Sequence, residues 1–289
     1  MVSKLLVAPL LALSLSASAC SQVTISGPVS LTGAVSTTTG FPSPPAGAEH
    51  FANLQSSSYT WSQTDTSAAG SQAGCTTGVG TITYGVASPS LSGASLEVTH
   101  PNTSGYYCNM LSYLKLGCGT LTGGCQPTGL RYFIEDFYVY FPSSNTGIMQ
   151  QYEYDPDLFD GTDRYFASFR ASTVSVDCLS TGTECWGLWN TAGNAWVKTN
   201  VDASSFIAAT NTWHHMQIYG YWDRATNSYT YIDIYVDGSP VFQNINQTYT
   251  DLGDTTTNTL QMEFQLDGNQ TAGTVTEYLD NANFYDWNG

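Results

Sequence analysis

Acidic, amide and phenol side chains recur at every second residue in several short segments of this chain. Residues 260–267 carry Gln261, Glu263, Gln265 and Asp267 in alternation with apolar residues. Because successive side chains of a β-strand point to opposite faces of its sheet, such a segment presents its polar set on one face. Phenols stack on the apolar faces of sugar rings, while amides and carboxylates bond to sugar hydroxyls. The pattern therefore indicates a sheet face suited to carbohydrate.

Residues 133–140, 213–221 and 229–236 show the same alternation. We expect their polar faces to gather with that of residues 260–267 on one concave sheet surface. The side chains predicted to contact sugar there are Asp136, Tyr138, Gln217, Tyr219, Tyr231, Asp233, Glu263 and Gln265. The alternative is a tyrosine-rich outer sheet that cross-strand aromatic pairs stabilise.

Cleavage on the same face would require two carboxylates that flank one glycosidic bond. Glu263 and Asp267 share a face, but their α-carbons lie roughly 13 Å apart, whereas such carboxyl pairs are roughly 5–9 Å apart. A cross-strand pair such as Asp233 with Glu263 is the stronger candidate. A lyase would use a histidine or tyrosine base, for which His215 is the candidate. A partly exposed structural histidine beside Trp213 is the alternative for His215.

Residues 155–163 hold the aspartates Asp155, Asp157, Asp160 and Asp163. Oxygen ligands at this density can hold a calcium ion, although the spacing is not that of an EF-hand. A solvated acidic loop is the alternative. No nucleophile elbow or nucleotide-binding loop occurs in the sequence, so no other cofactor is expected.

The elements that must position these side chains are short β-strands. No window of about twelve residues shows a convincing 3.6-residue apolar period, whereas runs rich in Tyr, Val, Ile, Phe and Thr follow one another after Glu49. Asp237-Gly238 and Asp267-Gly268 punctuate two of these runs, as hairpin turns do. The sequence therefore predicts an all-β protein, a two-sheet antiparallel jelly-roll sandwich.

The chain begins with the layout of a secretory signal peptide. Lys4, an apolar stretch at residues 5–15 and small residues at 17–19 predict cleavage after Ala19. Cys20 would then come first, where a bacterial lipoprotein carries its lipid, so we expect either a lipid anchor or plain secretion. Residues 20–47 predict a flexible tether, or alternatively a first edge strand at residues 23–31, ahead of one sandwich domain at residues 48–289.

Six cysteines follow Cys20, an even number that suits an oxidising compartment. The expected disulfides are Cys75–Cys108, Cys118–Cys125 and Cys178–Cys185. The chain has 7 Lys+Arg against 23 Asp+Glu and a net charge of −16. Such a surface repels phosphate backbones and anionic membranes, so no nucleic acid is expected, and a membrane is contacted only through the N-terminal lipid. We expect a monomer whose partner is a poly- or oligosaccharide.

Three segments resemble the concanavalin A-like lectin/glucanase superfamily, which includes laminin-G-like domains. They are Asn-Thr-Trp-His-His at 211–215, a strand ending in Val-Asp-Gly at 231–238, and the closing segment 277–285 with Leu-Asp-Asn. The match covers roughly residues 133–287. Sandwich glycanases of this kind place acids as Glu-x-Asp-x-x-Glu on one strand, whereas Glu135 and Asp136 are adjacent and therefore on opposite faces.

The resemblance implies carbohydrate or glycoprotein binding, or polysaccharide cleavage. The leading hypothesis is a carbohydrate-binding domain outside the cytoplasm, in the cell envelope or secreted. The first alternative is a secreted glycoside hydrolase or lyase that uses carboxylates of the same face. The second is a structural or adhesive envelope protein.

Overall fold

Nearly every described element is a β-strand, as the runs of β-branched and aromatic residues predict. The computed structural model describes residues 40–65, 80–174, 177–179, 184–191, 193, 195–250 and 258–289, all within the unit Thr37–Gly289. The predicted signal peptide, Cys20 and the part of the predicted tether or edge strand before residue 40 lie outside the described residues. Within the described ranges, no helix is long and apolar enough to cross a membrane.

Sheet A contains the last strand of the chain at its middle and runs in the order β14-β13-β12-β6-β17-β4-β3, with β1 also paired to β17 and β15 to β13. Its strands are β1 (Glu49–Phe51), β3 (Thr81–Val86), β4 (Ser95–Asn102), β6 (Leu130–Tyr140), β12 (Trp213–Asp223), β13 (Ser228–Val236), β14 (Ser239–Phe242), β15 (Gln247–Thr250) and β17 (Gly273–Asn288). Every pairing is antiparallel.

Sheet B runs in the order β11-β10-β9-β7-β16-β5-β2, with β8 also paired to β7. Its strands are β2 (Trp61–Asp65), β5 (Asn109–Gly117), β7 (Met149–Phe159), β8 (Arg164–Phe166), β9 (Phe169–Ser172), β10 (Cys185–Asn190), β11 (Ala195–Val197) and β16 (Thr259–Gly268). The helix α1 (Ser204–Ala208) and a 3-10 turn at Ser143–Asn145 are short additions.

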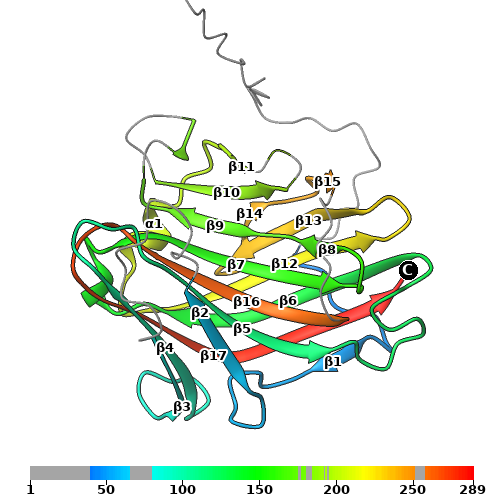
Figure 1. Ribbon diagram of the computed structural model, residues 1–289, viewed down its shortest axis with the longest axis horizontal. Helices are drawn as coiled ribbons and strands as arrows, with labels where there is room; N and C mark the ends of the chain where they lie inside the picture. Colours follow the sequence, from blue (N-terminus) through cyan, green and yellow to red (C-terminus); the bar gives the residue numbers. More distant parts are fainter. Residues whose placement is uncertain are drawn as a thin grey trace, which may run out of the picture. The chain divides into compact units, whose positions relative to one another are not determined.

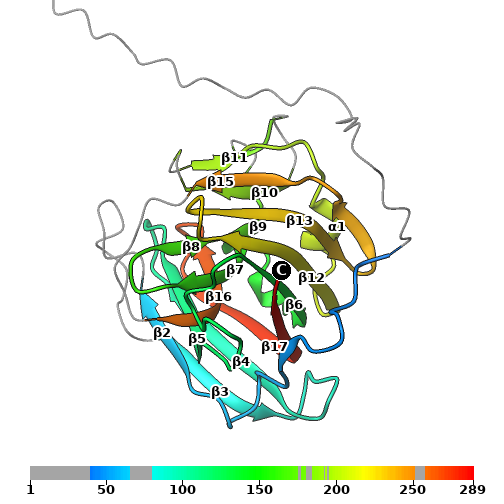
Figure 2. The ribbon, with the colours of Figure 1, turned by 90° about the vertical axis from the view of Figure 1, so that its right-hand side faces the viewer.

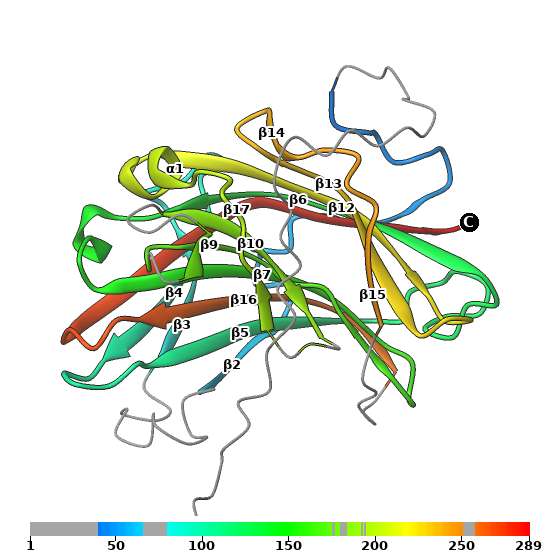
Figure 3. The same cartoon turned by 90° about the horizontal axis from the view of Figure 1, so that it is seen from above.

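The two sheets lie face to face (Figure 1). Seen from above, β12, β6 and β17 form one layer, and β7, β16 and β5 form the other (Figure 3). A view turned by 90° shows the stack running from β11 and β15 at one end to β2 and β3 at the other (Figure 2). The predicted two-sheet antiparallel sandwich is therefore confirmed.

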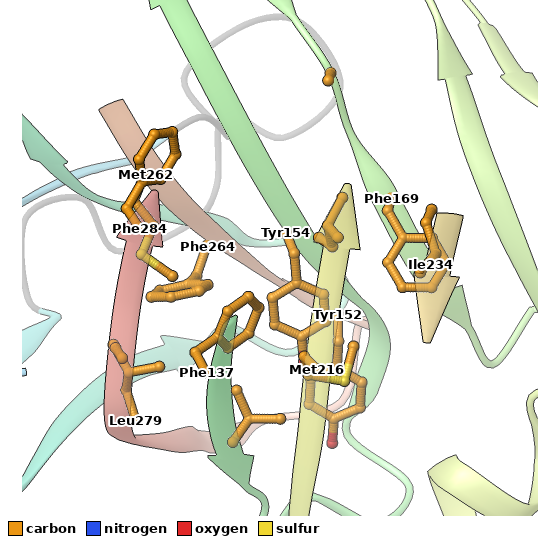
Figure 4. Close-up of a cluster of buried hydrophobic side chains, with 14 of the residues drawn as sticks. Phe137, Tyr152, Tyr154, Phe169, Met216, Ile234, Met262, Phe264, Leu279 and Phe284 are labelled. Carbon is orange, nitrogen blue, oxygen red and sulfur yellow. The ribbon is translucent and has the colours of Figure 1, made fainter. Parts of the chain in front are cut away.

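Apolar side chains from both sheets fill the space between the layers (Figure 4). Phe137 of β6 lies with its ring centroid 5.3 Å from Tyr154 of β7 and 5.5 Å from Phe264 of β16. Trp61 of β2 stacks on Phe264, with the ring centroids 5.2 Å apart. Each such side chain contributes about 1.5–3 kcal/mol on burial. The apolar residues that alternate with the predicted polar faces of β6, β12 and β16, such as Phe137, Met216 and Phe264, are buried, so these strands turn the expected face to the core.

A β-bulge in β13 overturns one predicted face. Tyr219 pairs with Asp233, but the next residue, Gly220, pairs with Tyr231, so Ile232 is the extra residue. Tyr231 therefore turns into the core, where it is fully buried and its hydroxyl donates to the Ser168 carbonyl at 2.6 Å. The prediction that Tyr231 contacts sugar is wrong, because strict alternation does not survive a bulge.

The structure tests two predicted hairpin turns and the predicted disulfides, and it confirms some of them. Asp237 and Gly238 both have positive φ, 52° and 73°, which fits the predicted hairpin turn. Asp267-Gly268 is not such a turn, because both residues still pair with β7 at the end of β16. The disulfides Cys118–Cys125 and Cys178–Cys185 are confirmed. The third expected disulfide involves Cys75, which lies outside the described residues.

Candidate functional site

The side chains predicted to form one sugar-binding face are divided between the two sheets. On the outer face of sheet A, Tyr138 and Asp136 of β6 lie beside His215 and Gln217 of β12, and Tyr219 pairs with Asp233 of β13. Glu263 and Gln265 lie on the outer face of sheet B. The predicted single face and the predicted Asp233–Glu263 pair are therefore wrong. Alternation assigns a side chain to one side of its strand but does not say which sheet the strand joins.

The outer face of sheet A is dominated by partly exposed rings that pack on one another. Trp287 of β17 lies 5.6 Å from Tyr132 of β6 at an interplanar angle of 10°, and 6.0 Å from Tyr219 of β12 at 20°. Tyr138 and His215 stack at 4.3 Å and 2°. These cross-strand pairs occupy ring faces that a sugar would otherwise use.

Asp136 is the polar centre of this aromatic face. One carboxylate oxygen bonds His215 Nε2 at 2.8 Å, and the other accepts from Gln217 Nε2 at 3.0 Å. Its neighbour Glu135 points the opposite way and is buried in the core, as the broken acid motif predicts. His215 is thus held by a carboxylate and a ring, an arrangement that orients the imidazole on a surface that water reaches.

The outer face of sheet B carries carboxylates instead of rings. Four side chains alternate along β7 and four along β16, and all eight point away from the core. The register places them opposite one another as Gln151↔Asp267, Glu153↔Gln265, Asp155↔Glu263 and Asp157↔Gln261. The five acids on this face are each no more than 4% exposed. Buried charges at this density require partners or protons.

The first carboxyl pair joins Asp157 of β7 to Glu263 of β16. Arg164 Nε donates to Asp157 Oδ2 at 2.9 Å, and Arg164 Nη2 lies 3.3 Å from Glu263 Oε2. Gln261 Nε2 donates to Glu263 Oε1. Asp155 lies directly across from Glu263 in the ladder. One arginine and one amide thus hold two acids from neighbouring strands.

The second carboxyl pair repeats this plan with Glu153 of β7 and Asp267 of β16. Gln151 Nε2 donates to a carboxylate oxygen of each acid, and Gln151 Oε1 accepts from Arg170 Nη1. Arg170 also pairs with Asp177 at 3.2 Å. The two pairs therefore share one composition: two acids, one glutamine and one arginine.

Each pair holds a proton more tightly than free acids do. Burial, followed by the charges and hydrogen bonds of neighbouring groups, raises the pKa of Asp157 and that of Glu153 well above their ordinary values. Burial also raises the pKa of Glu263 and that of Asp267 to about 7, against the lowering effect of Arg164, Arg170 and the paired acids. In both pairs burial thus raises the pKa of the β7 acid and of the β16 acid together, so each pair favours a bound proton.

The arginine of the first pair reaches the surface, whereas that of the second does not. β8 and β9 both lie alongside β7 (Figure 1). From β8, Arg164 lies between Phe159 and Phe166, with its guanidinium carbon 5.1 Å and 4.3 Å from the ring centroids, and its side chain is 25% exposed. From β9, Arg170 lies 4.1 Å from the Trp196 ring and is 5% exposed.

Sequence reasoning missed the β7 acids although a signal was present. Gln151, Glu153, Asp155 and Asp157 alternate as strictly as the β16 set, but Pro156 and the surrounding acids made this stretch resemble a loop. Sheet position explains the proline, because it sits where β7 meets the short edge strand β8. No signal in the sequence assigned the two arginines to the two pairs.

The predicted calcium ligands divide between the ladder and a turn. Asp155 and Asp157 belong to β7, whereas Asp160 accepts from Asp163 N at 2.8 Å and Arg224 Nε at 2.6 Å. Among the residues that the structure describes, no group of three or more His, Cys, Asp or Glu side chains is arranged to hold a metal ion. The calcium ion stays a prediction without support from this segment.

Comparison with known proteins gives distant structural likenesses only. No protein-family model matches the chain, and no curated protein matches it. Similar solved structures include an endo-β-1,4-glucuronan lyase from the fungus Trichoderma reesei (15% identity, 72% of this chain and 87% of the other, TM-score 0.39). They also include peanut lectin (10%, 83% and 97%, 0.42) and arcelin-5, a lectin-like defense protein from Phaseolus vulgaris (8%, 84% and 99%, 0.43). Because each TM-score is below 0.5, these likenesses carry no argument about function.

Proposed function

We propose that this protein binds a neutral carbohydrate on the outer face of sheet B and hydrolyses a glycosidic bond there. The observation that carries the proposal is the Asp157–Glu263 pair, two carboxyl groups from neighbouring strands that Arg164 bridges and whose pKa values burial raises. A protonated and an ionised carboxyl group in one site are the acid and the base that glycoside hydrolysis requires. The acidic ladder and the net charge of −16 disfavour a uronate substrate, and thus a lyase reaction.

The reaction balances with these two side chains and one water molecule. Asp157 gives its proton to the glycosidic oxygen while the bond between that oxygen and the anomeric carbon breaks. Water adds to the anomeric carbon and loses a proton to the Glu263 carboxylate. After the products leave, Glu263 returns that proton to Asp157 by way of water, since Arg164 is the side chain that bonds to both acids. The products are two sugars with new hydroxyl groups, and both acids regain their starting states.

The test is product release from a panel of neutral polysaccharides, measured as new reducing ends at pH 5–8. We expect release by the wild-type chain and a loss of about 10²–10⁴-fold in Glu263→Gln. Glu97→Gln is the matched control, because Glu97 lies on β4 of the other sheet and its side chain is partly exposed. Absence of product with every polysaccharide, or equal activity of Glu263→Gln and wild type, would reject the proposal.

A second candidate is carbohydrate binding without cleavage on the outer face of sheet A. The observation that favours it is the Asp136–His215–Gln217 group among partly exposed rings. A glycan array that scores binding of wild type and of Tyr219→Ala separates the two sites. Binding that Tyr219→Ala abolishes and Glu263→Gln preserves places the ligand on sheet A. If no glycan binds and Tyr219→Ala changes only stability, a structural or adhesive role is favoured.

The proposal includes export from the cytoplasm. The signal peptide layout and the cysteine content support this location, with lipid attachment at Cys20 as one form of it. Mass spectrometry of the mature N-terminus distinguishes a lipid-modified Cys20 from an unmodified chain that begins there. Retention of residues 1–19 in the mature protein would contradict export by this route.

A further inference from the structure

The two carboxyl pairs on sheet B differ in how completely their glutamines are used. Gln151 donates from its amide nitrogen to Glu153 and Asp267, and its amide oxygen accepts from Arg170. Gln261 donates to Glu263, but its oxygen is buried and has no hydrogen-bond partner. A buried acceptor without a donor costs free energy. Each pair leaves one carboxyl oxygen without a partner, Asp157 Oδ1 and Asp267 Oδ1, so the pairs differ in their glutamines: only the first has an unpartnered amide oxygen.

The arginines differ in the same sense. Arg170 is fixed by Gln151, Asp177 and the Trp196 ring, and its side chain is almost fully buried. The guanidinium of Arg164 bonds to the two acids and lies against two phenylalanine rings, and a quarter of its side chain faces solvent. The first pair therefore reaches solvent through one side chain, while the second is closed.

We propose that Asp157–Glu263 is the reacting pair, that Arg164 is the positioning residue that covers it, and that the unpartnered Gln261 oxygen accepts a hydroxyl of the bound sugar. This inference rests on the proposed function and adds to it the choice between two pairs of equal composition. Glu153–Asp267 is then a structural counterpart that holds β7 and β16 in register. A sugar hydroxyl supplies the donor that Gln261 lacks, which favours a neutral polyol over an anion.

Matched amide variants of the two pairs test the choice. Asp157→Asn and Glu263→Gln are compared with Glu153→Gln and Asp267→Asn, each with its melting temperature measured to establish folding. We expect kcat to fall about 100-fold or more in the first two variants and less than about tenfold in the last two. Activity that survives Glu263→Gln and disappears in folded Asp267→Asn overturns the inference but leaves the proposed function standing. Inactivity of the wild-type chain on every glycan rejects both.

Arg164 is tested by the pH dependence of kcat/KM, which a merely structural side chain would not move. Arg164 lowers the pKa of Glu263, so its loss raises that pKa and moves the acid limb of the profile to higher pH. We expect Arg164→Met to move this limb up by about one pH unit and Arg164→Lys, which keeps the charge, to restore it. An unmoved limb in folded Arg164→Met overturns the assignment of Arg164.

The Gln261 oxygen is tested through substrate affinity. Gln261→Met keeps the length of the side chain and removes the acceptor together with the donor to Glu263. We expect KM to rise about tenfold with a smaller change in kcat, because the lost bond forms to the bound sugar as well as in the transition state. An unchanged KM overturns the role of this oxygen.

Discussion

The outer faces of the two sheets obey the same alternation rule and present opposite chemistry. On sheet A the outward residues of β6, β12 and β17 are mostly rings that stack across strands and stay partly exposed. On sheet B the outward residues of β7 and β16 are acids and amides, and most of them are buried. Stacked rings are stabilised by partial burial. Buried carboxyl groups lose their solvation, and only ion-pair or hydrogen-bond partners or a bound proton compensate for that loss. The face that is costly to form is the better candidate for chemistry.

The largest expected difference between the faces concerns loss of an ion-pair partner. Arg170→Met leaves Glu153 and Asp267 without their cation in a buried site, and we expect the free energy of unfolding at pH 7 to fall by about 3 kcal/mol. Asp136→Asn on sheet A should cost less than about 1 kcal/mol, because Asp136 is partly exposed. Urea unfolding of both variants measures the difference. Equal costs would remove the distinction between the faces.

The pH dependence of stability should originate on sheet B. Asp267 has a pKa of about 7 in the folded chain and an ordinary value near 3.8, so the folded state binds its proton more tightly. Its contribution is complete below pH 4 and is lost as the pH rises to 7, at no more than about 1.4 kcal/mol per pH unit. We expect Asp267→Asn to flatten the curve of unfolding free energy between pH 4 and 7. A curve that Asp267→Asn leaves as steep as the wild-type curve would contradict the raised pKa.

Two tyrosines that alternation assigned to one face should respond differently to removal of the hydroxyl. Tyr231→Phe loses the bond to the Ser168 carbonyl and leaves that group buried, at a cost of about 1 kcal/mol. Tyr219→Phe lies on the partly exposed face and should change stability by less than about 0.5 kcal/mol. Thermal melts of the two variants suffice. Equal melting temperatures would question the bulge at Ile232.

The smallest expected effect is the coupling within the ring stack of sheet A. A double-mutant cycle on Tyr132→Ala and Trp287→Ala should give about 0.5–1 kcal/mol of interaction free energy, since their rings stack across strands. Additive losses would show that these rings do not support each other. The face would then be open to a ligand that uses the ring faces.

Alternation along the chain is sufficient to predict the strands, the sandwich and most core faces. It fails at Ile232, where one inserted residue reverses Tyr231, and it does not assign Glu263 to a sheet, because pairing across the sandwich is a tertiary outcome. The β7 acids alternate with the two-residue period of a strand, but Pro156 made this segment resemble a loop. The arginine partners come from edge strands, which no local pattern relates to β7 or β16.

The motifs on which the family resemblance rests have structural roles. Asp237 of the Val-Asp-Gly turn bonds His214 Nδ1 at 2.8 Å and accepts from the backbone N–H of His215 at 2.8 Å. Asp280 of the Leu-Asp-Asn segment accepts from Ser92 Oγ at 2.6 Å and from Leu91 N at 2.7 Å. These residues close turns and fasten a loop to β17. They therefore predict the fold and not the site, as motifs that recur across many functions do.

The central claim is that carbohydrate is handled on sheet B, and the most direct measurement is the position of a bound oligosaccharide. A crystal of Glu263→Gln soaked with the longest oligosaccharide that the wild-type chain cleaves would show that position. We expect sugar density beside Arg164, over β7 and β16, with a hydroxyl at the Gln261 oxygen. Density over the rings of Tyr132, Tyr219 and Trp287 on sheet A would contradict the claim.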